Sequence, residues 1–229
     1  MNPMASFLQN PARVLAEAVV RLVVRSEPAP IATVEAACEF ARTRAAFVAQ
    51  KKLYGYLKER IGTRYPKMFA DDRFVASINL AKLEVFAACL ADLTCFCVAN
   101  AMPGATSTNA ERAALARACY AAGIEANTLP EAASETRDSW LAAFERRLEA
   151  TVWQGTGASE HFFTESAPAL LRWAPIAAEL KRFDAEIVRN SIRYAWIEVR
   201  RDYLKRVDPA AVAADWRKGA GCPQAPATR

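Results

Sequence analysis

The chain is poor in the residues on which metal sites and several kinds of catalytic site depend. Its 229 residues include one histidine, His161, and eight glycines, and no two cysteines form a CxxC pair. A di-iron helical bundle needs two Glu-x-x-His pairs, and structural zinc sites are built from paired cysteine and histidine ligands. The G-x-S-x-G motif of α/β serine hydrolases is also missing. We therefore predict no metal and no cofactor.

The six cysteines do not have the spacing of a disulfide-rich or metal-binding domain. They are Cys38, Cys89, Cys95, Cys97, Cys119 and Cys222. A chain of this length buries about 70% of its unfolded surface and needs no covalent cross-link. We therefore expect the cysteines to be reduced and buried. Reduced cysteines indicate a location in the cytoplasm, either free or peripherally at the inner membrane.

Long uninterrupted hydrophobic runs are also lacking. The longest apolar stretch, residues 74–102, contains Lys82, Glu84 and Asp92, so we predict no transmembrane span. Residues 1–25 place charged side chains four apart beside apolar ones. This pattern predicts an amphipathic helix rather than the hydrophobic core of a signal peptide.

Apolar residues recur with the 3.6-residue period of helices, and the alternation typical of strands is lacking. We predict an all-α fold, a single helical bundle of six or seven helices built on a long antiparallel hairpin of residues 32–61 and 72–101. Gly62 provides a stop for the first of these helices, and Asp71 or Asp72 an N-cap for the second. The predicted domains are an N-terminal amphipathic helix (1–25), a helical bundle domain (31–207), and a short helix with a flexible Gly/Pro/Ala-rich tail (208–229).

Turn signals divide the rest of the bundle domain into four further helices. The first follows a cap at Thr108 or Asn109 and ends at Gly123, and the second covers about 130–153. The third is predicted over 167–181, bent at Pro175, and the fourth over 184–207.

Positive charge is concentrated in one segment. Residues 42–67 contain eight basic residues and one acidic residue, a net charge of +7, whereas the whole chain carries +5. Such a local field attracts an anionic partner and speeds its arrival without identifying it.

Helical spacing places part of this segment in one row, the basic–aromatic ridge: Arg44, Phe47, Lys51, Tyr54 and Lys58. These residues are three or four apart and so share one side of a helix. Cations beside aromatic rings could bind nucleic-acid phosphates, lipid headgroups or an acidic protein helix. The alternative is a solvated flank whose basic side chains cover the edge of the core. No recognised nucleic-acid-binding motif accompanies the ridge.

A second ridge follows the same spacing near the end of the chain: Arg189, Arg193, Trp196, Arg200 and Tyr203. Arginine beside tryptophan or tyrosine is a favourable pairing and a common composition of protein interfaces. The second ridge is therefore either another docking surface or a solvated helix face.

Polar residues in the most apolar predicted helix, 72–101, mark a candidate pocket: Asn79, Lys82, Glu84 and Asp92. A helix that is apolar nearly all round belongs at the centre of a bundle, where an unpaired charge is costly. These residues either line a small pocket for a polar ligand or form satisfied ion pairs with other helices.

The longest internal loop, residues 154–166, contains a nucleophile and a base close in sequence, Ser159 and His161. An esterase would also need an oriented histidine and an oxyanion hole. The alternative is that His161 caps or anchors the loop.

Two stretches carry a resemblance to a known family: QKKLYGYLKERIGTRYPKMFADDRFVASINLAKLEVFAACLADL (50–93) and FFTESAPALLRWAPIAAELKRFDAEIVRNSI (162–192). They resemble an uncharacterised all-helical family of alphaproteobacterial proteins, some of which carry the label esterase. The resemblance covers most of the chain after about residue 30. It implies a bacterial cytoplasmic protein, with ester hydrolysis as an activity but no catalytic residues to transfer.

We predict a docking or adaptor protein without catalytic activity, which presents the basic–aromatic ridge to an acidic protein or an anionic membrane surface. The alternative is a bundle whose candidate pocket binds or transforms a small molecule, and an esterase using Ser159 and His161 is the third prediction. Nucleic acid is a further partner that the charge allows and no motif supports.

Overall fold

Helices make up most of the described chain, which confirms the predicted all-α bundle. The computed structural model describes residues 29–127, 134–153 and 160–219. The longer helices are α2 (Val34–Ile61), α4 (Asp72–Ala101), α5 (Asn109–Asn127), α6 (Ser134–Ala150) and α9 (Ala185–Arg206). The shorter elements are α3 (Tyr65–Met68), α7 (Ser166–Trp173), α8 (Ala178–Lys181), α10 (Pro209–Arg217) and the 3-10 turns η2 (Gly62–Arg64) and η3 (Glu160–Phe162). The predicted helix at 1–25 and the end of the tail lie outside the described residues.

Local chemistry sets the ends of the long hairpin formed by α2 and α4. The Thr33 hydroxyl accepts a hydrogen bond from the N–H of Ala36 at 3.1 Å and caps α2. Gly62 ends α2 with a φ of 60°, in the left-handed region that favours glycine. The Asp71 carboxylate accepts from the N–H of Arg73 at 2.9 Å, so Asp71 is the cap of α4.

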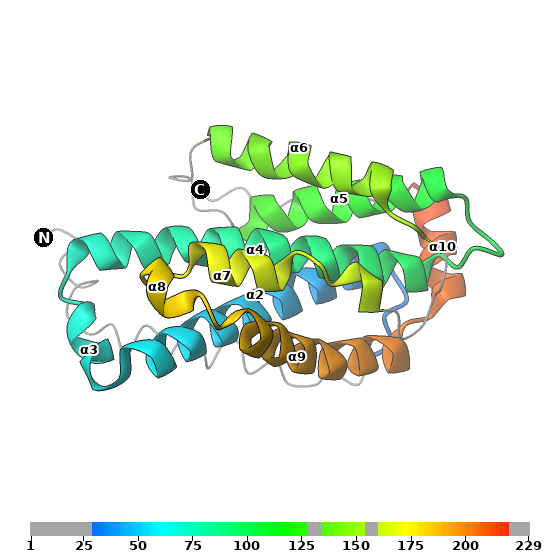
Figure 1. Ribbon diagram of the computed structural model, residues 1–229. Coiled ribbons are helices and arrows are strands. Elements are labelled where there is room, and N and C mark those ends of the chain that lie inside the picture. The colour runs from blue at the N-terminus through cyan, green and yellow to red at the C-terminus, as the bar shows by residue number, and fades with distance from the viewer. Residues whose placement is uncertain (1–28, 128–133, 154–159, 220–229) are drawn as a thin grey trace, which may run out of the picture.

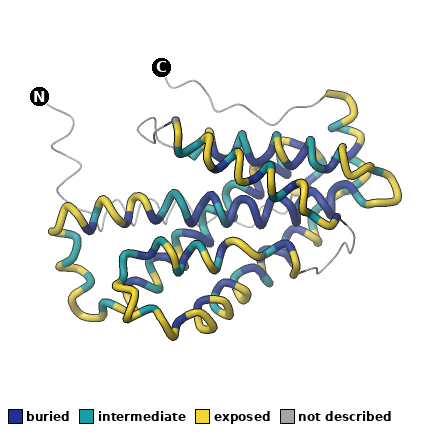
Figure 2. The backbone as a smooth tube through the Cα atoms, turned by 45° about the horizontal axis from the view of Figure 1, so that its top comes forward, coloured by how far each residue is buried: buried dark blue, intermediate teal, exposed yellow. Residues whose placement is uncertain are grey.

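α4 is the central helix of the bundle. In Figure 1 it runs along the molecule with α5 and α6 on one side, α2 and α9 on the other, and α7 in front. Its second half, from Val85 to Ala101, is buried except at Ala88 (Figure 2). By length and composition α4 could cross a membrane, but half of its apolar window is buried in the bundle. The core helix of a bundle meets the same criteria, so this is weak evidence for a span.

Pro175 divides the helix predicted over 167–181 instead of bending it. α7 ends at Trp173, and Ala174 has the extended ψ of 127° expected of a residue that precedes proline. The chain becomes helical again only in α8.

Gly123 does not end α5, which continues to Asn127. A Cβ atom on Gly123 would lie 2.7 Å from a methyl carbon of Leu90. The glycine therefore allows α5 to approach α4 closely, and its role is packing rather than termination.

The end of the chain closes the bundle on the start of α2. The N–H of Ile31 donates to the carbonyl of Arg206 at 2.8 Å, and the N–H of Asp208 donates to Ile31 at 3.0 Å. The Asp215 carboxylate of α10 accepts from the N–H of Val34 at 2.9 Å. α10 is therefore part of the bundle, and the predicted domain boundary at residue 207 comes too early.

The cysteine prediction is wrong for one pair. Cys38 of α2 and Cys119 of α5 form a disulfide, with their Cα atoms 5.1 Å apart. Cys89, Cys95 and Cys97 are free and buried, and burial raises the pKa of Cys95 to about 11. Packing of α5 against α2 brings the bonded pair together across 81 residues, which sequence spacing does not reveal. The cytoplasmic location stays a prediction that this pair does not support, since disulfides persist mainly in oxidising compartments.

Candidate functional site

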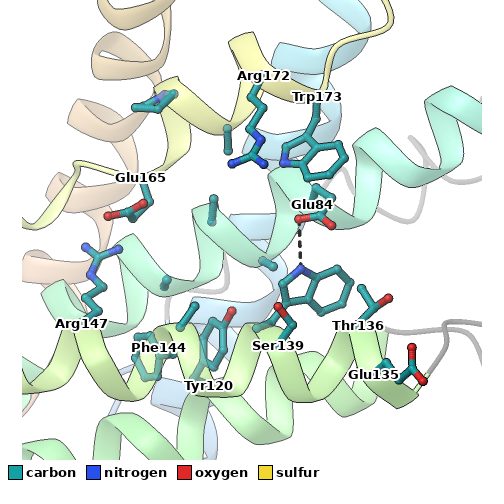
Figure 3. Close-up of a pocket in the computed structure, with 17 residues that line it drawn as sticks. Glu84, Tyr120, Glu135, Thr136, Ser139, Phe144, Arg147, Glu165, Arg172 and Trp173 are labelled. Atoms are coloured by element: carbon teal, nitrogen blue, oxygen red, sulfur yellow. Dashed lines mark hydrogen bonds between the residues drawn. The ribbon is translucent and has the colours of Figure 1, made fainter.

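A cleft of about 650 Å³ opens between α6 and α7 above α4, and we call it the α6–α7 cleft (Figure 3). Its volume lies in the range of sites for small organic ligands. Small side chains leave this space between the helices: Ala87, Ala88 and Ala91 of α4, Ala143 of α6 and Ala169 of α7. The sequence thus creates the cleft by placing methyl groups where larger side chains would have filled the gap.

α6 is held away from α4 because it packs on α5. The rings of Tyr120 and Phe144 stack with their centroids 4.0 Å apart, which fixes α6 to α5. Long side chains make the contacts between α6 and α4. For example, Trp140 Nε1 donates to Glu84 Oε2 at 3.0 Å. The cleft is the space left between the two helices beside these side chains.

Aromatic side chains form the walls on both sides. Phe144 lies on the α6 side and Trp173 on the α7 side (Figure 3). Trp140 of α6 also lines the cleft. The Arg172 guanidinium lies 5.2 Å from the centroid of the Trp173 ring. The cleft therefore offers aromatic surfaces to a ligand from two helices.

Asp92 anchors the start of α7 beneath one end of the cleft. Its carboxylate is fully buried and accepts hydrogen bonds at 2.6–3.2 Å from Arg147 Nη1, the N–H groups of Thr164, Glu165 and Ser166, and Ser166 Oγ. Ser166 Oγ also accepts from Trp196 Nε1 of α9 at 3.1 Å. A carboxylate is favourable at a helix N-terminus, where the N–H groups lack partners within the helix. The carboxylate of Asp92 thus joins α4 to α6 and α7 directly, and to α9 through Ser166.

The cleft is electronegative once the anchor is taken into account. Burial lowers the pKa of Arg147, but its neighbours, with Asp92 first among them, together outweigh this effect and the pKa of Arg147 is raised. Arg147 is thereby neutralised by a group outside the cleft. The remaining charged lining residues are Glu84, Glu135, Glu165 and Arg172, a net charge of −2. This balance favours a cationic ligand.

Of the four residues predicted to form a pocket, Glu84 lines the cleft. Asn79 is exposed and Lys82 is half-buried, with its pKa lowered by burial, and neither lines the cleft. Asp92 is closed in its ion pair with Arg147. The prediction of a pocket around Asp92 and Lys82 is therefore wrong, because Arg147 and the start of α7 cover Asp92 beneath one end of the cleft.

The basic–aromatic ridge is divided between two roles. Arg44 pairs with Asp202 of α9 at 3.1 Å, and its side chain is only 14% exposed. Tyr54 is half-buried, and its pKa is raised to about 12. Burial is the larger cause, and the electrostatic effect of Tyr65 adds to it. Lys51 and Lys58 are exposed, and Lys51 Nζ lies 5.3 Å from the ring centroid of half-buried Phe47. The ridge therefore presents two of its three cations to solvent.

The second ridge does not form an open docking surface. Trp196, Arg200 and Tyr203 are buried, and Tyr203 Oη donates to the carbonyl of Cys97 at 3.0 Å. Arg189 and Arg193 are exposed. α9 turns this row toward the bundle because its aromatic rings fill the core beside α4 and α7.

The predicted serine–histidine pair is described only in part, because Ser159 lies outside the described residues. His161 Nε2 lies 3.1 Å from the carbonyl oxygen of Val152. A carbonyl oxygen can only accept, so Nε2 is the donor and cannot serve as the catalytic base. His161 anchors the end of the loop, as the alternative prediction held.

Sequence reasoning missed the walls of the cleft. Trp173 and Arg172 belong to a stretch that reads as an ordinary helix, and Trp140 fits a core position equally well. The alanines of α4 at 87, 88 and 91 were the available signal, because they cluster on one part of the central helix.

Comparison of the chain with protein-family models, curated proteins and solved structures finds no match. The resemblance to the alphaproteobacterial family stays a prediction from the two quoted stretches.

Proposed function

We propose that the protein is a ligand-binding helical bundle whose α6–α7 cleft holds a small hydrophobic organic cation. The observation that supports it is the combination, in one cleft of about 650 Å³, of aromatic walls with a net charge of −2 once Arg147 is paired with Asp92. Alanine methyl groups provide an apolar floor for a ring system. Ring faces attract cations, and carboxylates beside them add charge complementarity.

The Trp140–Glu84 pair is the most specific element of this proposal. The indole N–H donates to the Glu84 carboxylate at 3.0 Å, which fixes the ring and the negative charge side by side. A ligand cation can then contact both groups without reorganising either. Across the cleft, Trp173 supplies a second ring.

Filling the cleft should abolish this binding. Berberine, a planar aromatic cation that fluoresces in apolar surroundings, is the probe. We expect saturable binding to the wild type, weakened at least about tenfold in Ala88→Phe, because the new ring occupies ligand space. Glu84→Gln should weaken binding roughly fivefold, since it removes the charge but keeps an acceptor for Trp140.

Glu149→Gln is the matched control, because Glu149 is exposed on α6 and does not line the cleft. It should leave the affinity within about twofold, as surface changes usually do. Equal binding by wild type and Ala88→Phe would show that the dye binds elsewhere and would contradict the proposal.

Docking to an anionic membrane surface is a second candidate function, favoured by unpaired charge on and after α2. Lys51, Lys58, Arg64 and Lys67 are exposed and form no ion pair with any other residue of the described ranges. Glu59 is the one acidic residue in the 42–67 segment. Unlike Arg44, these cations can approach an anionic surface without breaking a contact between helices.

Charge reversal of the exposed ridge cations tests this second candidate. Lys51→Glu/Lys58→Glu should abolish recovery on phosphatidylglycerol vesicles and keep the free energy of unfolding within about 0.5 kcal/mol of wild type. Arg201→Glu/Lys205→Glu makes the same change in net charge on α9 and should retain most of the recovery. Equal recovery of both double variants would rule out the ridge as the docking surface.

A further inference from the structure

A smaller pocket of about 220 Å³ lies between η3 and α9, and it shares no lining residue with the α6–α7 cleft. We call it the arginine pocket, because Arg189, Arg193 and Arg200 line it together with Glu160, Phe163 and Trp196. Four residues of the second ridge thus line this pocket. The second ridge, which the sequence suggested as a docking surface, instead lines a pocket.

Positive charge in the arginine pocket exceeds the negative charge that faces it. Arg193 Nε lies 3.0 Å from Glu160 Oε2, and Arg200 Nη2 lies 3.4 Å from Glu160 Oε1. Arg189 makes no ion pair with any residue in the part of the chain that the structure describes. One carboxylate among three guanidinium groups leaves a net charge of +2. Glu160 occupies a position that an external anion could take.

Packing prepares the pocket for a ligand. The Arg200 side chain is only 9% exposed, and its guanidinium lies 5.5 Å from the centroid of the Phe163 ring. The Phe163 ring in turn lies 5.0 Å from the Trp196 ring. A planar guanidinium held in place loses less entropy when it binds an anion, and guanidinium geometry suits phosphate oxygens. The adjoining aromatic wall can contact an apolar group.

We propose that the arginine pocket binds a phosphate ester, with its phosphate on Arg189, Arg193 and Arg200 and its organic group against Phe163. A phosphate monoester carries a charge of about −1.5 to −2 at neutral pH, which matches the pocket better than the single charge of a carboxylate. This site shares no lining residue with the α6–α7 cleft, so a negative result for one site leaves the proposal for the other unchanged. Exposed Ile187 and Tyr194 lie near these arginines on α9, so the ester could come from a lipid headgroup or from solution.

Calorimetric titration of the full chain with phenyl phosphate tests the proposal. The wild type should bind saturably, and Arg189→Gln should weaken binding about tenfold, because a charged hydrogen-bond donor is lost. Glu160→Gln should strengthen binding roughly threefold or more, because it removes the competing carboxylate. Arg201→Gln, an exposed arginine of α9 outside the pocket, is the matched control and should stay within about twofold.

Two results would overturn the proposal. One is the absence of saturable phenyl phosphate binding by both the wild type and Glu160→Gln. The other is an equal loss of affinity in Arg189→Gln and Arg201→Gln, which would show that the ligand is attracted by the overall positive charge of α9 and not by the pocket. Vesicles containing phosphatidic acid identify the source of the phosphate. Vesicle binding that Arg189→Gln reduces assigns it to a lipid headgroup, whereas binding of phenyl phosphate alone assigns it to a soluble ester.

Discussion

Asp92→Asn should lower the free energy of unfolding by about 3–5 kcal/mol, because it leaves the buried Arg147 without its counter-charge. Asp92 is 0% and Arg147 14% exposed, so solvent cannot replace the lost interaction. At the start of α7, Ser166 Oγ and three backbone N–H groups donate to the Asp92 carboxylate. The amide of the variant replaces one of the accepting oxygens with a donating NH₂ group, so some of these donors lose their acceptor. Denaturation by guanidinium chloride, followed by circular dichroism, measures the change.

Asp138→Asn is the control for the Asp92 prediction. Asp138 is exposed on α6, so the same chemical change should alter stability by less than about 0.5 kcal/mol. Asp92→Asn/Arg147→Met should lose less than the sum of the single variants, because the second change removes the stranded charge. A loss below about 1 kcal/mol in Asp92→Asn, or strict additivity, would show that Asp92 is not the anchor of α7.

Reduction of the Cys38–Cys119 disulfide should lower the free energy of unfolding by about 4 kcal/mol, from the chain entropy of a loop of this length. The bonded residues are 81 apart in sequence, and the loop contains all of α4. Opening the bond frees this segment mainly in the unfolded chain. Chemical denaturation with and without a phosphine reductant measures the difference.

Cys38→Ala/Cys119→Ala is the control for the disulfide prediction. It should resemble the reduced wild type and should not respond to the reductant. Cys89, Cys95 and Cys97 are buried, with the pKa of each thiol raised by burial, so they should remain unreactive in the folded chain. A wild type whose stability is the same with and without reductant would contradict the prediction.

Sequence patterns predicted the helices well because their signals are local. The hairpin, its stop at Gly62 and its cap at Asp71 each depend on a few neighbouring residues. The same local reasoning failed at Gly123, where the glycine serves a contact with Leu90 on another helix. It also placed the end of the bundle at residue 207, because local patterns do not reveal the hydrogen bond between Asp215 and the distant Val34.

The candidate sites were less predictable, because each depends on which helix covers which face. Helical spacing alone grouped Arg44 with Lys51, yet Arg44 turns to Asp202 of α9 and Lys51 stays in solvent. Spacing likewise grouped Arg189 with Trp196, but only the packing of η3 against α9 makes them line one pocket.

The sequence by itself determined the all-α class, the α2–α4 hairpin and the concentration of charge in residues 42–67, because periodicity, caps and composition are properties of neighbouring residues. The tertiary structure decided the partner of Asp92, the pairing of Cys38 with Cys119, and the positions of the α6–α7 cleft and the arginine pocket. These features join residues tens of positions apart, and the packing of α6 on α5 and of α7 over Asp92 sets the distances between them.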